Sequence, residues 1–167
     1  MGKNLNQLPD DFNIPKNSHM GDLNGEKLTI GIVCAKFNQQ ITGALLMGAM
    51  QGLTDNKVKE SNITTVWVPG AFEVPTAMNI LFPKVDCIIA IACIIKGGTP
   101  HFDYVCQGIT HGINLANQAH KKPGIFCVLT TNTIKQAEER AKPNSSNNKG
   151  YEAALAAIEM GTLNLNG

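Results

Sequence analysis

The stretch A-I-A-C-I-I-K-G-G-T-P-H-F-D-Y, residues 90–104, decides how this chain folds. It begins as an uninterrupted apolar run, which is typical of a strand covered on both faces of a sheet. The run ends at Gly97 and Gly98, where the backbone can turn tightly and a ligand can approach it closely. A helix is predicted just beyond, and the free N–H groups at a helix N-terminus favour an anion such as phosphate.

His101 follows that turn, and histidine is the side chain whose ordinary pKa, about 6.5, lies nearest neutrality. A phosphate cradle beside a proton-transfer group indicates an enzyme that acts on a small phosphorylated molecule. A plain glycine turn carrying a surface histidine fits the stretch equally well, because Gly-Gly turns are common. The stretch alone leaves both interpretations open.

Strand and helix patterns alternate on both sides of this stretch. Strands are predicted over residues 27–36, 63–68, 87–95 and 125–129, and helices over 40–57, 74–81, 102–120, 134–141 and 151–163. Strict alternation predicts an α/β fold, with a four-stranded parallel sheet and helices on both of its faces. The first and last helices are rich in glycine and alanine, which permits close helix packing, including packing between subunits.

The carboxyl ends of three predicted strands carry unusual residues. They are Phe37-Asn38, the Gly-Ala-Phe-Glu turn at residues 70–73, and the segment from Gly97 to His101. Ligands of parallel α/β sheets bind at the carboxyl ends of the strands. We therefore expect these three ends to form one shared site.

Composition is that of a globular protein with one core. Of the 167 residues, 43% are hydrophobic and 16% are charged, which excludes a disordered chain. The formal net charge of +1 gives no electrostatic reason to expect nucleic acid or a membrane surface as a partner. No apolar run approaches the ~20 residues that span a bilayer, and the N-terminus has no signal-peptide pattern.

Five cysteines are present, and no two are spaced C-x-x-C: Cys34, Cys87, Cys93, Cys106 and Cys127. An odd number, mostly inside apolar runs, indicates buried free thiols in a reducing compartment, which predicts a cytoplasmic protein. No His/Cys spacing matches a zinc pattern, so no metal site is expected. Residues 1–26 are polar and lack a sustained period, which predicts a flexible arm before a domain at 27–167. The arm is either disordered or adds a strand to a neighbouring subunit's sheet.

Four motifs together resemble the lumazine synthase family. They are V-W-V-P-G-A-F-E-V-P at 66–75, I-K-G-G-T-P-H-F-D-Y at 95–104, V-L-T-T-N-T-I-K-Q-A-E-E-R-A at 128–141, and N-K-G at 148–150 followed by A-A-L-A-A-I-E-M at 153–160. The resemblance implies a flavodoxin-like three-layer α/β/α sandwich. It also implies an enzyme that condenses 5-amino-6-(D-ribitylamino)uracil with 3,4-dihydroxy-2-butanone 4-phosphate. The products are 6,7-dimethyl-8-ribityllumazine, phosphate and water, in the penultimate step of riboflavin biosynthesis, and no metal or organic cofactor is implied.

The resemblance implies a role for each matching residue. Phe37 is similar to the aromatic residue that stacks on the pyrimidine ring, and His101 to the proton shuttle. The ribityl chain is assigned Asn38, Ala71, Phe72 and Glu73, although Glu73 also fits an acid favoured at a helix start. The phosphate is assigned Gly97, Gly98 and Thr99, with Arg140 as the opposing charge. The remaining substrate-binding residues are Cys93, Ile94, Ile95 and Lys96 at the strand end, Phe126 beside the pyrimidine, and Lys149 at the uracil carbonyl.

In the family, the counterparts of Phe126, Arg140 and Lys149 come from a neighbouring subunit. The resemblance therefore implies a homo-oligomer, a pentamer or a multiple of pentamers, and an inactive monomer. Lys96 departs from the arginine of many relatives, and the two cations are not equivalent at a bidentate site. The connection K-P-N-S-S-N-N at 142–148 is longer than the family's compact turn, which favours a free pentamer or a pair of pentamers over a closed shell.

Two other functions remain open at this point. A flavin- or lumazine-binding scaffold would keep the fold without catalysis, but it would not need His101, Arg140 and Lys149. A phosphosugar isomerase or aldolase would use a similar α/β frame. A Schiff-base aldolase, however, needs a desolvated lysine on a strand, and Lys96 and Lys149 are both predicted to lie in loops.

Overall fold

The apolar run before Lys96 forms β3 (Cys87–Ile95), an interior strand of a four-stranded sheet. This computed structural model describes residues 12–143 and 147–164. The other strands are β1 (Ile30–Ala35), β2 (Ile63–Val68) and β4 (Gly124–Thr131), and all pairings are parallel in the order β2-β1-β3-β4. The predicted strand order along the chain and the parallel sheet are therefore confirmed.

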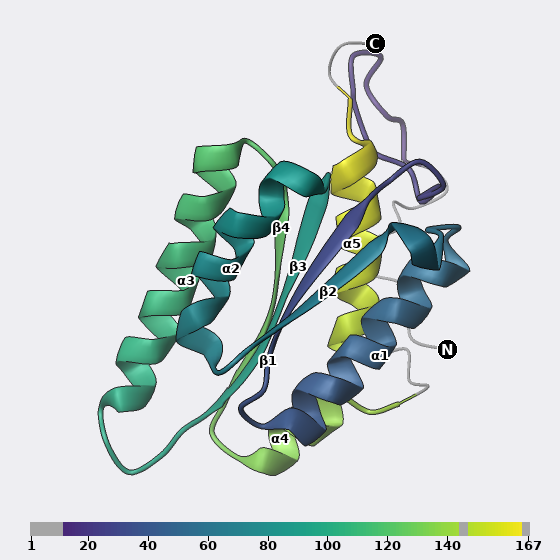
Figure 1. The fold of residues 1–167 in the computed structure, drawn as a ribbon. Coiled ribbons are helices and arrows are strands. Elements are labelled where there is room, and N and C mark those ends of the chain that lie inside the picture. The colour runs from purple at the N-terminus through teal and green to yellow at the C-terminus, as the bar shows by residue number, and fades with distance from the viewer. Residues whose placement is uncertain (1–11, 144–146, 165–167) are drawn as a thin grey trace.

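Helices cover both faces of the sheet and make a three-layer sandwich (Figure 1). One layer holds α1 (Gln39–Asp55), α4 (Ile134–Arg140) and α5 (Lys149–Thr162), and the other holds α2 (Val74–Leu81) and α3 (His101–His120). Short 3-10 turns precede or follow these elements at η1 (Glu60–Asn62), η2 (Ala71–Glu73) and η3 (Phe82–Lys84).

β3 supplies both halves of the core because successive side chains of a strand point to opposite faces. Ile89 and Ile91 pack on the α1 and α5 side, whereas Ile88 and Ala90 pack on the α2 and α3 side. All four side chains are fully buried. This two-sided burial explains why the strand reads as a continuous apolar run and not as an alternating one.

Small residues bring α1 and α5 together inside one subunit. A Cβ at Gly52 would lie 2.8 Å from the Cβ of Ala154, and a Cβ at Gly150 would overlap the carbonyl of Leu45. The two helices can approach this closely only because these positions lack side chains. Close packing between subunits, one use suggested for these small residues, is not needed to explain them.

Three helix starts differ from the sequence prediction, and the smallest differences are at α1, which begins at Gln39 and not at residue 40, and at α3. α5 begins at Lys149 and not at residue 151, because the side chain of Asn148 caps it. The prediction that Lys149 lies in a loop is therefore wrong, because this residue lies in the first turn of a helix. α3 begins at His101, one residue earlier than predicted, and β1 is confined to Ile30–Ala35 within the predicted 27–36.

Residues 12–26 form neither helix nor strand in the described chain. Their last part is attached to the domain, since the N–H of Asp22 donates to Oγ1 of Thr162 (2.8 Å) and the N–H of Gly25 donates to the carbonyl of Asn56 (2.9 Å). Residues 1–11 of the predicted arm lie outside the described residues. Among the helices of the described chain, none is both long enough and apolar enough to cross a membrane.

Candidate active site

A cleft of about 730 Å³, here called the strand-end cleft, opens where β1, β2 and β3 end. The β3 end contributes Cys93, Ile94 and Ile95, and the other predicted residues in its lining are Phe37, Ala71, Phe72, Glu73, Gly97, Thr99 and His101. The three strand ends that looked unusual in the sequence thus face one hollow. Gly70 of the predicted 70–73 turn also lines it, and so do four residues that the sequence did not indicate: Pro69, Phe102, Tyr104 and Val105.

The turn after β1 projects Phe37 into this cleft. The N–H of Lys36 donates to the carbonyl of Val68 (2.8 Å), and the N–H of Phe37 donates to that of Pro69 (3.2 Å), so the ends of β1 and β2 are tied together. Tied in this way, the phenyl ring of Phe37 remains 70% exposed. An exposed ring on a fixed backbone is suited to stacking on a flat ligand.

Asn38 lies outside the lining of the cleft and holds its wall. Its backbone is left-handed (φ 59°, ψ 44°), a conformation that asparagine tolerates better than most residues. Its side-chain amide donates to the carbonyl of Cys93 (2.9 Å), which fixes the start of α1 to the end of β3. Asn38 was predicted to bind the ribityl chain, and one N–H of its side-chain amide is already used within the protein.

Aromatic side chains of η2 and α3 also line the cleft. Phe72 is 64% exposed and Tyr104 is 71% exposed. Phe72 lies against α3 at Gly108, where an added Cβ would come within 2.5 Å of the ring. Tyr104 follows His101 by three residues on the same helix, so the two lie on one side of α3, although this spacing does not by itself place Tyr104 in the cleft.

The loop between β3 and α3 is exposed and open. The N–H of Lys96 donates to the carbonyl of Thr131 (2.8 Å), which anchors the loop to the end of β4. A Cβ at Gly97 or Gly98 would meet nothing within 4 Å, and neither residue has a positive φ. The turn therefore does not use the conformational freedom of glycine, and what the two glycines leave is free space in which a ligand can approach the backbone. Lys96 and Gly98 belong to the loop but not to the lining of the cleft.

His101 occupies the mouth of the strand-end cleft as the first residue of α3. Its side chain is exposed, and among the described residues it has no hydrogen-bonding partner. Both ring nitrogens are therefore available to a ligand. Cys93 in the same cleft offers no nucleophile, because burial raises the pKa of its thiol to about 11 and keeps it neutral near pH 7.

A second hollow of about 430 Å³, here called the β4 cavity, runs along the edge strand β4. It is lined by Phe126, Arg140 and Lys149, the three remaining predicted residues, and by Glu152. The two cavities have no lining residue in common. One chain thus separates Phe37 and His101 of the predicted site from Arg140 and Lys149.

The cations of the β4 cavity are held by partners within the chain. Lys149 Nζ pairs with Glu152 at 2.7 Å and 2.9 Å from its two carboxylate oxygens, and Arg140 Nη1 donates to the carbonyl of Gln136 (2.8 Å). Cys127 lies beneath Lys149 and donates its thiol to the Lys149 carbonyl (3.5 Å). Burial raises the pKa of Cys127 to about 12, so the permanent charges of this cavity are those of Arg140, Lys149 and Glu152.

Together the two cavities offer what a planar heterocycle and a phosphate require: flat apolar walls, a histidine and two cations. In the part of the chain that the structure describes, no three His, Cys, Asp or Glu side chains are grouped to hold a metal ion. The model of the 6,7-dimethyl-8-ribityllumazine synthase family matches residues 27–164.

Proposed function

The chain belongs to the 6,7-dimethyl-8-ribityllumazine synthase family, and we propose that its active site is shared by the strand-end cleft of one subunit and the β4 cavity of the next. The protein is an enzyme of riboflavin biosynthesis, not a non-catalytic scaffold. It condenses 5-amino-6-(D-ribitylamino)uracil with 3,4-dihydroxy-2-butanone 4-phosphate to give 6,7-dimethyl-8-ribityllumazine. Our proposal concerns which residues bind these substrates and how many chains are needed.

The separation of the two cavities carries the proposal. The reaction requires both substrates to be held together, since orientation supplies much of the acceleration of a two-substrate reaction. Within one chain His101 and Phe37 face one hollow while Arg140 and Lys149 face another. β4 is an edge strand with Phe126 exposed, so a second copy can place its cleft against it. Contact between two different surfaces of the same chain closes into a ring, which suits a pentamer.

Each substrate has a chemically matched place in this shared site. The pyrimidine stacks on Phe37, with Phe126 and Lys149 of the neighbouring subunit at its other side. Backbone groups around η2 bind the ribityl hydroxyls, because a polyol needs several fixed donors and acceptors. The butanone phosphate enters the open loop at Thr99 and meets Arg140 of the neighbouring subunit, whose guanidinium can bind phosphate in a bidentate way.

His101 moves the protons of the reaction. Imine formation, phosphate loss and ring closure each transfer a proton, and a histidine can accept or donate one near neutral pH. The side chain lies at the mouth of the cleft with both ring nitrogens free of protein partners among the described residues. General acid–base catalysis contributes about 10²–10⁴-fold, so His101→Ala should slow the enzyme by that factor without abolishing turnover.

Subunit complementation tests the shared site. His101→Ala and Arg140→Ala chains, each with a different affinity tag, are coexpressed, and particles carrying both tags are assayed for lumazine formation. If the site is shared, about a quarter of the interfaces in a randomly mixed ring pair an intact cleft with an intact β4 cavity. Activity should then rise well above that of either single variant. Mixed particles no more active than the average of the two variants would contradict the proposal.

The free thiols support a cytoplasmic location. All five cysteines are unpaired, and Cys34, Cys87, Cys93 and Cys127 are buried. Thiols persist in reducing compartments, so we place the enzyme in the cytoplasm.

A further inference from the structure

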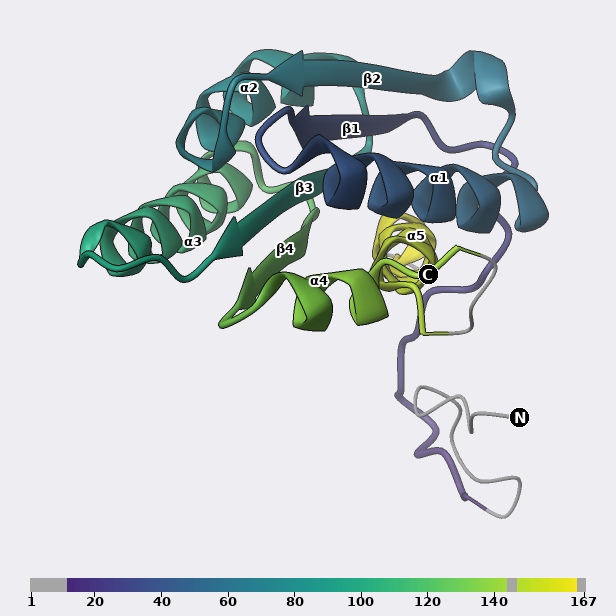
Figure 2. The same ribbon diagram turned by 90° about the horizontal axis from the view of Figure 1, so that it is seen from below.

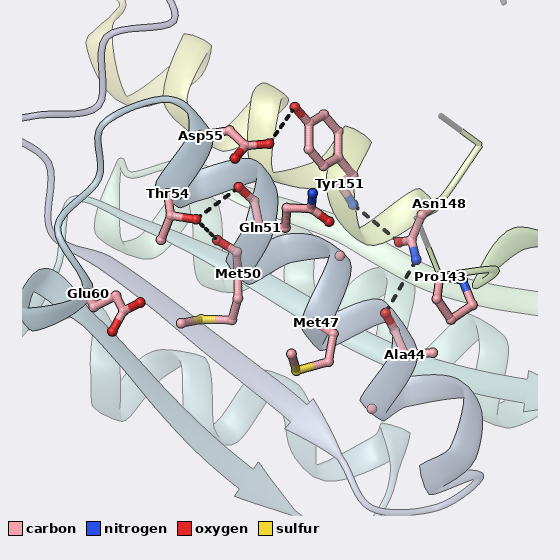
Figure 3. Close-up of a pocket in the computed structure, with 12 residues that line it drawn as sticks. Ala44, Met47, Met50, Gln51, Thr54, Asp55, Glu60, Pro143, Asn148 and Tyr151 are labelled. Atoms are coloured by element: carbon pink, nitrogen blue, oxygen red, sulfur yellow. Dashed lines mark hydrogen bonds between the residues drawn. The ribbon is translucent and has the colours of Figure 1, made fainter. Parts of the chain in front are cut away.

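We infer that Asn148 is a positioning residue for this active site: it fixes Arg140 and Lys149 relative to each other. Asn148 is only 3% exposed and lies between α1 and the connection that joins α4 to α5. Figure 3 shows its amide directed toward Ala44 of α1 and Tyr151 of α5. The inference rests on the roles proposed above for the two cations.

The oxygen of the Asn148 amide caps α5. Oδ1 accepts from the N–H groups of Gly150 (2.8 Å) and Tyr151 (3.3 Å). Free N–H groups of a first helical turn are commonly satisfied by such a side chain. Because Gly150 directly follows Lys149, this cap fixes the backbone from which the Lys149 side chain projects.

The nitrogen of the same amide holds the end of α4. Nδ2 lies within hydrogen-bonding distance of the carbonyls of Ala141 (3.2 Å) and Lys142 (3.3 Å) and, on α1, of Ala44 (3.3 Å). Ala141 directly follows Arg140, the last residue of α4. The Asn148 amide is therefore bonded to Ala141, which follows Arg140, and to Gly150, which follows Lys149. Its contact with Ala44 connects these two backbone segments to α1.

Helix capping alone does not require this residue. Aspartate caps a helix as well as asparagine does and is favoured by the positive end of the helix dipole. Of these two residues, however, only asparagine both accepts from α5 and donates to carbonyls of α4 and α1, because an ionised aspartate has no donor. Asn148→Asp thus keeps the cap and removes the contacts to the Arg140 side.

Gly48 gives a second way to move Asn148. This buried glycine of α1 faces the amide, and an added Cβ would overlap Oδ1 and Cγ of Asn148. Gly48→Ala therefore displaces Asn148 without changing its chemistry. Gly43 of the same helix is the matched control, since a Cβ there would meet nothing within 4 Å. Both substitutions give α1 the same gain in helix propensity.

The test compares KM, kcat and thermal stability of assembled Asn148→Asp, Gly48→Ala and Gly43→Ala. A displacement of about 1 Å far from the reacting atoms can cost up to ~10²-fold, so Asn148→Asp and Gly48→Ala should raise KM for both substrates by roughly tenfold. Gly43→Ala should keep the wild-type constants. Asn117→Asp removes a comparable donor, from Nδ2 to the carbonyl of Gly124 (2.9 Å) at the start of β4, and should lower stability without changing KM.

Unchanged KM values in Asn148→Asp, with only a lower melting temperature, would overturn the inference and leave Asn148 as a structural cap. If Asn148→Asp fails to fold, Gly48→Ala decides by the same criterion. Arg140→Ala and Lys149→Ala are measured in parallel. If those two variants keep wild-type KM values, the shared-site proposal fails; if they raise KM while Asn148→Asp and Gly48→Ala do not, only the positioning role fails.

Discussion

Aromatic residues of similar size have opposite environments in this molecule. Phe82 is fully buried and stacks on His120, with ring centroids 5.0 Å apart, whereas Phe37 is 70% exposed. Burial of a phenyl ring stabilises a fold by roughly 1.5–3 kcal/mol, and an exposed ring contributes little of this. The conformation that keeps Phe37 in solvent is therefore explained better by a ligand than by the core.

Phe37→Ala should weaken substrate binding with little effect on stability. Loss of stacking worth about 0.5–1.5 kcal/mol predicts a roughly two- to tenfold rise in KM for the pyrimidine substrate. The free energy of unfolding should change by less than about 0.5 kcal/mol, as for other surface positions. Phe82→Ala is the contrasting variant and should destabilise by about 3–5 kcal/mol. Steady-state kinetics and denaturant unfolding of both variants check this, and a destabilised Phe37→Ala with unchanged KM would contradict it.

The buried thiols make stability fall at high pH. Burial raises the pKa of Cys34 and Cys93 to about 11, and of Cys87 and Cys127 to about 12. In the unfolded chain these thiols ionise near about pH 8.5, so their contribution is complete below that pH. As pH rises from there toward 11–12, the thiols ionise in the unfolded state while burial keeps them neutral in the folded state. The free energy of unfolding therefore decreases.

Melting temperatures measured between pH 7.5 and 10.5 should therefore decline above about pH 8.5. Cys87 is fully buried, and Cys87→Ala should reduce the steepness of the decline, although the cavity it leaves lowers stability at every pH. An identical slope in wild type and variant would show that other groups, such as lysines and tyrosines, govern the alkaline limit.

At the scale of elements, the spacing of hydrophobic residues along the chain and the residues that follow each strand made most of the fold predictable. β3 and β1 are buried on both faces, so their apolar runs identify them directly. The start of α5 was missed because it depends on the side chain of Asn148, which a hydrophobic pattern does not register. Tyr104 and Pro69 were missed for a different reason. Their place in the cleft depends on how α3 and η2 pack, and sequence spacing alone does not define that packing.

The contact between η2 and α3 predicts the effect of Gly108→Ala. An added Cβ at Gly108 would come within 2.5 Å of the Phe72 ring, so the ring must move relative to the cleft. The alanine also raises the helix propensity of α3 by about 1 kcal/mol, which should preserve or increase thermal stability. We expect a severalfold rise in KM for the pyrimidine substrate in a stably folded enzyme. Gly43→Ala in α1 serves as the control for helix propensity, and equal KM values in the two variants would contradict the expected role of Phe72.

At the scale of the whole molecule, the chain carries two separate cavities, which we propose are the two halves of a shared site. The strand-end cleft lies where β1, β2 and β3 end, and the β4 cavity lies along the edge strand β4. Figure 2 shows where these strands lie in the sheet. Neither half holds both the histidine and the cations. If the proposed shared site is right, activity depends on assembly, so oligomeric state and turnover should change together.

Dilution tests that coupling, and particle mass tests the size of the assembly. The connection from α4 to α5 carries Pro143, and its residues 144–146 lie outside the described residues. We expect a pentamer of 17.9 kDa chains, about 90 kDa, or a pair of pentamers near 180 kDa, since a ring built from one heterologous contact is complete without further contacts.

Light scattering should give one of these masses, and specific activity should fall on dilution in parallel with the loss of that particle. A shell above about 1,000 kDa would overturn the assembly prediction alone, because a shell of pentamers keeps every shared site. An active 17.9 kDa monomer would overturn the shared site itself.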